Sequence, residues 1–139
     1  MKILLDTNVV LEFLLKQPHA MEVKQLLEEV PFSDIGLSVF TVDSLGVYLT
    51  RRQTPHLFTE FLDDWLIDGN VTQLGLRPED LHKVVEVARL FNLDFDDAYQ
   101  VVTAEKYDLI LVSFDAHFDS TPRGRKRPAD LLSSGRQTS

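Results

Sequence analysis

The chain has 139 residues, 44% of them apolar, and a formal net charge of −8. This is the length of one domain, and it is long enough to bury a hydrophobic core. The absence of cysteine excludes disulfides, thiolate metal sites and a cysteine nucleophile, and no apolar run approaches the roughly 20 residues of a membrane span.

Four short segments predict strands over residues 2–5, 33–38, 71–74 and 109–114, of which the last is the most apolar. Apolar residues at helical spacing predict helices over 9–16, 19–30, 54–69, 77–92 and 94–107, and a further helix that is capped near Thr41. Strands that alternate with helices predict an α/β fold, a parallel β-sheet sandwiched between helices. We expect a single domain over 1–132 and a disordered tail over 133–139.

Helix ends are marked by residues with distinct backbone preferences. Thr54 followed by Pro55 is typical of an N-cap and a first helical residue, and Gly69 is placed where a helix ends.

Charge is distributed unevenly along the chain. Residues 1–119 hold 21 Asp and Glu against 9 Lys and Arg, whereas residues 120–139 hold 1 Asp against 5 Lys and Arg. The acidic part would repel a polyanion unless it binds cations. The basic run "PRGRKRP" at 122–128 is either a solvated terminus or a contact for a polyanion.

Carboxylates follow the predicted strands. Asp6 ends the first strand and Asp115 the fourth, Asp43 follows the second by a few residues, and Asp97 lies in the segment that leads to the fourth. Ligands bind beyond the carboxyl ends of parallel strands, so these residues are expected at one edge. Like charges gathered there need neutralisation, and hard oxygen ligands select Mg²⁺ or Mn²⁺.

Each carboxylate also has a purely structural explanation. Asp6 with Thr7 and Asn8 would cap the helix that follows, and acids near Asp97 would complement a helix dipole. Alternatively, Asn8 supplies a neutral oxygen or orients Asp6, and Thr7 donates its hydroxyl to a carboxylate or to bound water.

Three stretches in order, "LLDTNVVL", "DFDDAYQVVTAEKY" and "LVSFDAHF", resemble the PIN-domain family, in particular its small single-domain VapC-like members. The resemblance implies a metal-dependent endoribonuclease that hydrolyses RNA, possible dimerisation and, for toxin members, inhibition by an antitoxin protein. A cytoplasmic location without membrane contact is expected. The resemblance to the PIN-domain family also implies catalytic roles for four residues, namely Asp6, Asp43, Asp97 and Asp115. Of these, Asp6, Asp97 and Asp115 would hold the metal, with Thr7, Asn8 and Ser113 in support.

Two positions depart from the family pattern. The second acid is usually Glu, and here either Asp43 or Ser44 is the aligned residue. The last motif usually has another acid two residues after the first, where this chain has His117.

Two other functions compete with this prediction. A PIN-like module that binds RNA or protein without cutting is one. A phosphoaspartate protein of the receiver or haloacid-dehalogenase type is the other, although Asn8 stands where the dehalogenase motif has its second Asp.

Overall fold

The computed structural model describes residues 1–133 and shows a four-stranded parallel sheet in the order β3-β2-β1-β4. The strands are β1 (Ile3–Leu5), β2 (Ile35–Ser38), β3 (Thr72–Leu74) and β4 (Ile110–Val112). The helices are α1 (Thr7–Leu14), α2 (Ala20–Glu29), α3 (Val39–Arg51), α4 (Pro55–Phe61), α5 (Pro78–Phe91) and α6 (Phe95–Lys106). Shorter turns are η1 (Phe32–Asp34), η2 (Leu62–Ile67), η3 (Ala116–Ser120) and η4 (Pro128–Leu131). The predicted α/β fold is confirmed.

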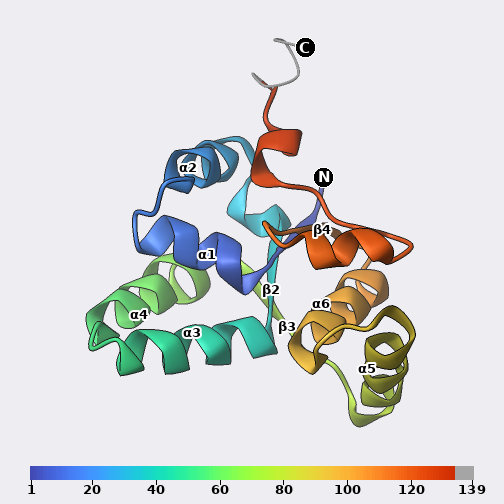
Figure 1. Cartoon of the computed structure of the whole chain (residues 1–139). Helices are drawn as coiled ribbons and strands as arrows, with labels where there is room; N and C mark the ends of the chain where they lie inside the picture. The colour runs from blue at the N-terminus through green and yellow to red at the C-terminus, as the bar shows by residue number, and fades with distance from the viewer. Residues whose placement is uncertain (134–139) are drawn as a thin grey trace.

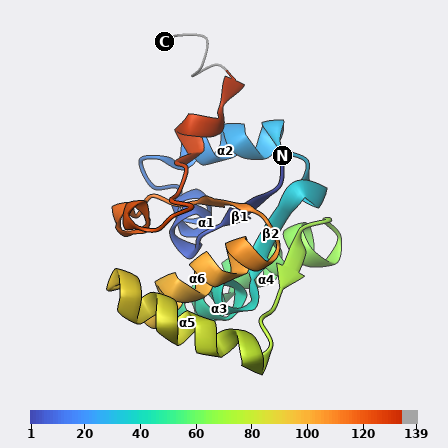
Figure 2. The ribbon, with the colours of Figure 1, turned by 90° about the vertical axis from the view of Figure 1, so that its right-hand side faces the viewer.

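Both faces of the sheet are covered by helices. In Figures 1 and 2, α1 to α4 lie on one side of the strands and α5 and α6 on the other. Along β1, Ile3 and Leu5 pack into the core on the first side, and Leu4 packs into the core on the second. β1 and β4 are therefore apolar throughout, as parallel strands covered on both faces are, whereas the edge strand β3 has exposed residues at Thr72 and Gln73.

The strand order reverses at β1. The next two strands in the chain, β2 and β3, lie on one side of β1, and the last strand, β4, lies on the other side. A crevice forms at such a reversal, outside the carboxyl ends of the two strands. Asp6 directly follows β1, and Asp115 lies three residues beyond the end of β4. The topology thus places these two residues at the point where open α/β sheets bind ligands.

Three local predictions can be compared with the structure. Thr54 is at the N-cap position of α4 and Pro55 is its first residue, as predicted, but the Thr54 hydroxyl donates to the Leu49 carbonyl and makes no capping hydrogen bond. The cap of α3 is Ser38 rather than Thr41, because the Ser38 hydroxyl accepts the Thr41 backbone N–H at 3.0 Å. The helix from Pro55 continues as the π-helical turn η2 and ends before Gly69, where a Cβ atom would lie 2.4 Å from the Asp64 carbonyl oxygen.

The basic run 122–128 is tied to the outer edge of β4 and is not a solvated terminus. The Lys126 N–H donates to the Leu111 carbonyl at 2.8 Å, and the Ser113 N–H donates to the Lys126 carbonyl at 3.0 Å. This pairing covers a sheet edge that would otherwise present free backbone groups. Of the tail predicted over 133–139, only Ser133 is described, and its N–H donates to the Glu29 carboxylate at 3.2 Å; residues 134–139 lie outside the described part.

None of the helices in residues 1–133 is both long enough and apolar enough to cross a bilayer.

Candidate metal centre

Asp6 is a buried carboxylate at the end of β1, with 7% of its surface exposed. Its Oδ1 accepts from the Thr7 N–H and from Gln100 Nε2, both at 2.9 Å, and its Oδ2 accepts from Ser113 Oγ at 2.7 Å. Asp6 is also the N-cap of α1. Capping uses one of its contacts, so the cap alone does not account for the side chains that converge on both oxygens.

A pocket of about 260 Å³, which we call the acid pocket, opens beside Asp6 and contains three further carboxylates. Asp96 and Asp97 come from the first turn of α6, and Asp115 caps the turn η3 after β4. The residues that line the pocket are Asp6, Thr7, Asn8, Leu11, Phe40, Ser44, Asp96, Asp97, Gln100 and Asp115. Residues 109 positions apart in the sequence therefore meet at one edge of the sheet.

The charges in this pocket are poorly compensated by the protein. Burial, reinforced by the charges of Asp96, Asp6 and Asp115, raises the pKa of Asp97 to about 6. Burial also raises the pKa of Asp6, although hydrogen bonds from Gln100 and Ser113 partly oppose that increase. Such a group of carboxylates favours either protons or a cation.

Asn8 and Ser113 join the ends of β1 and β4. Asn8 Nδ2 donates to Ser113 Oγ at 3.2 Å, and Asn8 Oδ1 accepts the Phe114 N–H at 3.3 Å. The Asp115 N–H donates to the same Ser113 hydroxyl at 2.9 Å. Asn8 thus fixes the loop that carries Asp115, while Ser113 connects that loop to Asp6.

The structure does not bring Asp43 into the pocket. Asp43 is exposed on α3 and lines a neighbouring groove with Val47, Tyr48 and two arginines, whereas the next residue, Ser44, lines both that groove and the acid pocket. The position facing the other carboxylates from α3 is therefore occupied by a hydroxyl. The acids that line the pocket are Asp6, Asp96, Asp97 and Asp115.

His117 lies near the mouth of the site. Its Nδ1 is 3.2 Å from Asp115 Oδ1, and its side chain is 77% exposed. Ligand atoms of Asp97, Asp115 and His117 lie within 4.8 Å of one another, as do those of Asp94, Asp96 and Asp97. The donor set is dominated by carboxylate oxygens, which fits Mg²⁺ or Mn²⁺ better than softer metals.

The sequence analysis assigned no role at the site to Gln100, and it treated Thr41 only as a helix cap. Gln100 is 2% exposed and Thr41 is fully buried, and Gln100 Nε2 donates to Thr41 Oγ1 at 2.8 Å. The signal for Gln100 was its position three residues after Asp97, on the same helix face, within the buried run Ala98–Ala104. A lone buried amide in such a run indicates specific partners.

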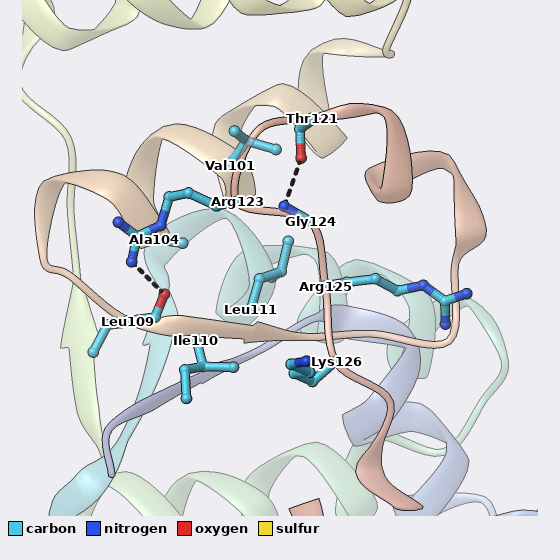
Figure 3. Close-up of a pocket in the computed structure, with 10 residues that line it drawn as sticks. All are labelled: Val101, Ala104, Leu109, Ile110, Leu111, Thr121, Arg123, Gly124, Arg125 and Lys126. Atoms are coloured by element: carbon cyan, nitrogen blue, oxygen red, sulfur yellow. Dashed lines mark hydrogen bonds between the residues drawn. The ribbon is translucent and has the colours of Figure 1, made fainter. Parts of the chain in front are cut away.

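A second cavity, of about 230 Å³, lies between α6, β4 and the basic run, and it shares no lining residue with the acid pocket. Leu111 and Val101 form part of its apolar wall (Figure 3). The Arg123 and Arg125 side chains extend in opposite directions from it. Arg123 pairs with Asp108, and Arg125 pairs with Asp119 while donating to the Ser113 carbonyl at 3.2 Å.

Comparison with known proteins identifies a matching family and several solved structures with a similar fold. A PIN domain matches residues 3–124. A toxin–antitoxin complex from Klebsiella pneumoniae contains a similar chain, with TM-score 0.72 and 20% identity over 91% of this chain and 98% of that one. FitAcB from Neisseria gonorrhoeae has TM-score 0.71 and 24% identity over 93% and 99% of the two chains.

VapBC2 from Rickettsia felis, solved with a DNA fragment from its promoter, has TM-score 0.72 and 15% identity over 91% and 98% of the chains. At these identities the structures show the shared fold. No curated protein matches the chain. The family match covers most of the sequence, and so the chain belongs to the PIN-domain family.

Proposed function

We propose that this protein is a divalent-metal-dependent endoribonuclease of the VapC type, the toxin of a toxin–antitoxin pair. The observation that carries the proposal is the convergence of Asp6, Asp97 and Asp115 on one pocket at the strand-order reversal. These three side chains would hold Mg²⁺ or Mn²⁺. When bound, such an ion neutralises the carboxylates, polarises a phosphoryl oxygen and lowers the pKa of a bound water.

The residues of the chain position this chemistry. Asp6 is held through both oxygens, so its carboxylate keeps one orientation. The Asn8 and Ser113 contacts fix the loop of Asp115. In the basic run 122–128, Lys126 and Arg127 are exposed and would supply positive charge for a salt-sensitive and sequence-independent contact with an RNA backbone.

The proposed partners have different support. An antitoxin is supported by the toxin–antitoxin complexes among the similar structures. For a homodimer, Leu49, Phe61 and Trp65 are not available as contacts, because they are buried in the core of the single chain. Exposed apolar side chains on α3, Val47 and Tyr48, are the better candidates for that contact. A cytoplasmic location remains part of the proposal.

One observation favours a second candidate, a PIN domain that binds RNA without cutting it. Ser44 lines the pocket from α3 in place of an acid, so that side of the site adds no negative charge. The phosphoaspartate alternative has no comparable support, since the chain matches the PIN family over residues 3–124.

The test is cleavage of mixed-sequence single-stranded RNA in Mn²⁺ or Mg²⁺ by the parent and by Asp6→Asn. Because removing a group that supports a metal ligand costs about 10- to 100-fold in activity, removing the ligand itself should cost at least about 100-fold. Asp115→Asn is a second variant that leaves the buried contacts of Asp6 with Gln100 intact. Asp63→Asn, the same chemical change at an exposed site on η2, is the matched control and should cleave like the parent.

Two results would contradict the proposal. Equal cleavage by Asp6→Asn and the parent would show that the pocket is not catalytic. Metal-independent RNA binding by a parent that never cleaves would identify the non-catalytic module instead.

A further inference from the structure

Gln100 is a buried amide in the wall of the acid pocket. It lies one turn after Asp97 on α6 and is 2% exposed. Removing an amide from water is unfavourable unless its hydrogen-bonding groups find partners. The contacts of Gln100 therefore indicate what its side chain does.

The NH₂ group of Gln100 is fully used, whereas its oxygen is not. Nε2 donates to Asp6 Oδ1 at 2.9 Å and to Thr41 Oγ1 at 2.8 Å. Within residues 1–133, the buried Oε1 atom has no hydrogen-bond partner. Because both partners of Nε2 are acceptors here, the two donors hold the amide in place despite the unfavourable burial of its oxygen.

The contact with Asp6 completes the restraint of that carboxylate. Gln100 holds Oδ1 from α6, and Ser113 holds Oδ2 from the end of β4. Without the Gln100 donor, the side chain of Asp6 would be restrained at Oδ1 only by the N–H of the adjacent residue, Thr7.

The contact with Thr41 fixes the direction of another hydroxyl. A hydroxyl group has one hydrogen and two lone pairs. Thr41 Oγ1 accepts from Ser38 Oγ at 3.2 Å and from Gln100 Nε2, so its own hydrogen is left for Thr7 Oγ1 at 3.0 Å. Thr7 is then the acceptor in that bond, and its own hydrogen is free to donate to a group in the pocket that Thr7 lines.

We propose that Gln100 is a positioning residue that orients the Asp6 carboxylate for a divalent cation and, through Thr41, directs the Thr7 hydroxyl hydrogen to a phosphate oxygen of bound RNA. The inference rests on the proposed ribonuclease function. It assigns Gln100 a part in preorganising the site, where Ser44 supplies no acid from α3.

The experiment measures Mn²⁺ binding to the full chain by titration calorimetry, without RNA. Gln100→Met keeps the approximate volume and removes both donors, and we expect Mn²⁺ affinity to fall about 10- to 100-fold. Thr103→Val is the matched control, because it removes a buried hydrogen bond from the same helix, to the Tyr99 carbonyl, away from the pocket. Its Mn²⁺ affinity should equal that of the parent even if its melting temperature falls.

Thr41→Val tests the second half of the inference and still applies if Gln100→Met does not fold. It leaves the Gln100 contact with Asp6 possible but removes the hydroxyl that accepts from Gln100 and donates to Thr7. We expect Mn²⁺ affinity within about twofold of the parent and a KM for RNA raised severalfold, since a phosphate contact is weakened.

The outcomes separate this inference from the proposed function. A parent that binds Mn²⁺ and cleaves RNA, together with Gln100→Met that binds Mn²⁺ equally well, overturns the inference alone. Thr41→Val with an unchanged KM overturns the part that concerns Thr7. A parent that neither binds Mn²⁺ nor cleaves overturns the proposed function, and the inference with it.

Discussion

The two cavities beside α6 have nearly the same size and opposite chemistry. The acid pocket, of about 260 Å³, is lined by four carboxylates, and the cavity in Figure 3, of about 230 Å³, is lined mainly by aliphatic groups. In the second, Arg123 and Arg125 already pair with nearby aspartates. In the first, burial and mutual repulsion raise the pKa of Asp97 to about 6.

Volume alone therefore does not distinguish the two cavities, whereas the charges that line them do. An apolar cavity whose two arginines are paired has few charged groups to offer a charged ligand. A pocket whose carboxylates repel each other favours a cation, because binding relieves the repulsion. The following predictions test whether the two cavities act as independently as this comparison implies.

The largest effect on stability is expected from the apolar cavity. Leu111 is 4% exposed in its wall, and Leu111→Ala would lower the free energy of unfolding by about 2–4 kcal/mol through lost burial and an enlarged void. Chemical denaturation measures this loss. Mn²⁺ affinity should not change, and a large drop in that affinity would show that the two cavities are coupled.

A smaller effect, of opposite sign at neutral pH, is expected from the acid pocket. The folded pKa of Asp97, about 6, lies above its ordinary value of 3.8, so the folded state binds this proton more tightly than the unfolded state. The associated stability is present below about pH 4 and is lost as pH rises to about 6. The raised pKa of Asp6 acts in the same direction.

Asp97→Asn should therefore melt several degrees higher than the parent at neutral pH in the presence of a chelator, and close to the parent near pH 4. Thermal denaturation over this range gives the answer. A variant that melts below the parent at neutral pH would show that Asp97 is stabilised by contacts that outweigh the repulsion.

The smallest effect separates two neighbouring residues of α3. Ser44→Glu adds a carboxylate to the acid pocket, so Mn²⁺ affinity should rise severalfold while the metal-free protein becomes less stable. Asp43→Asn changes an exposed charge outside the pocket and should alter neither quantity measurably. The reverse pattern in calorimetry would place Asp43, rather than Ser44, at the site.

Much of the fold could be predicted because it depends on local patterns. The four segments predicted as strands are strands in the structure, with ends that differ from the prediction by no more than two residues. Thr54 and Pro55 lie at the predicted start of α4, because the fixed φ of proline suits the first helical position. The cap of α3 was placed three residues too late, because Ser38 reads equally well as the last residue of a strand.

The site was predicted less completely, for geometric reasons. Asp6 and Asp115 were placed correctly at one edge, since both follow parallel strands. Asp43 was wrongly expected there. Successive side chains of a helix point about 100° apart, so the position at which α3 starts decides which of its residues faces the pocket. Gln100 was missed because its partners lie 94 and 59 residues away in the sequence.

By itself, the sequence determined the α/β architecture, the places of the strands along the chain and the acids that follow β1 and β4, since apolar periodicity and chain order are local properties. Only the tertiary structure decided which α3 side chain lines the pocket, which polar side chains hydrogen-bond with one another, and that the basic run pairs with β4. Each of these depends on the relative rotation and register of elements far apart in the chain, which packing of the whole core sets.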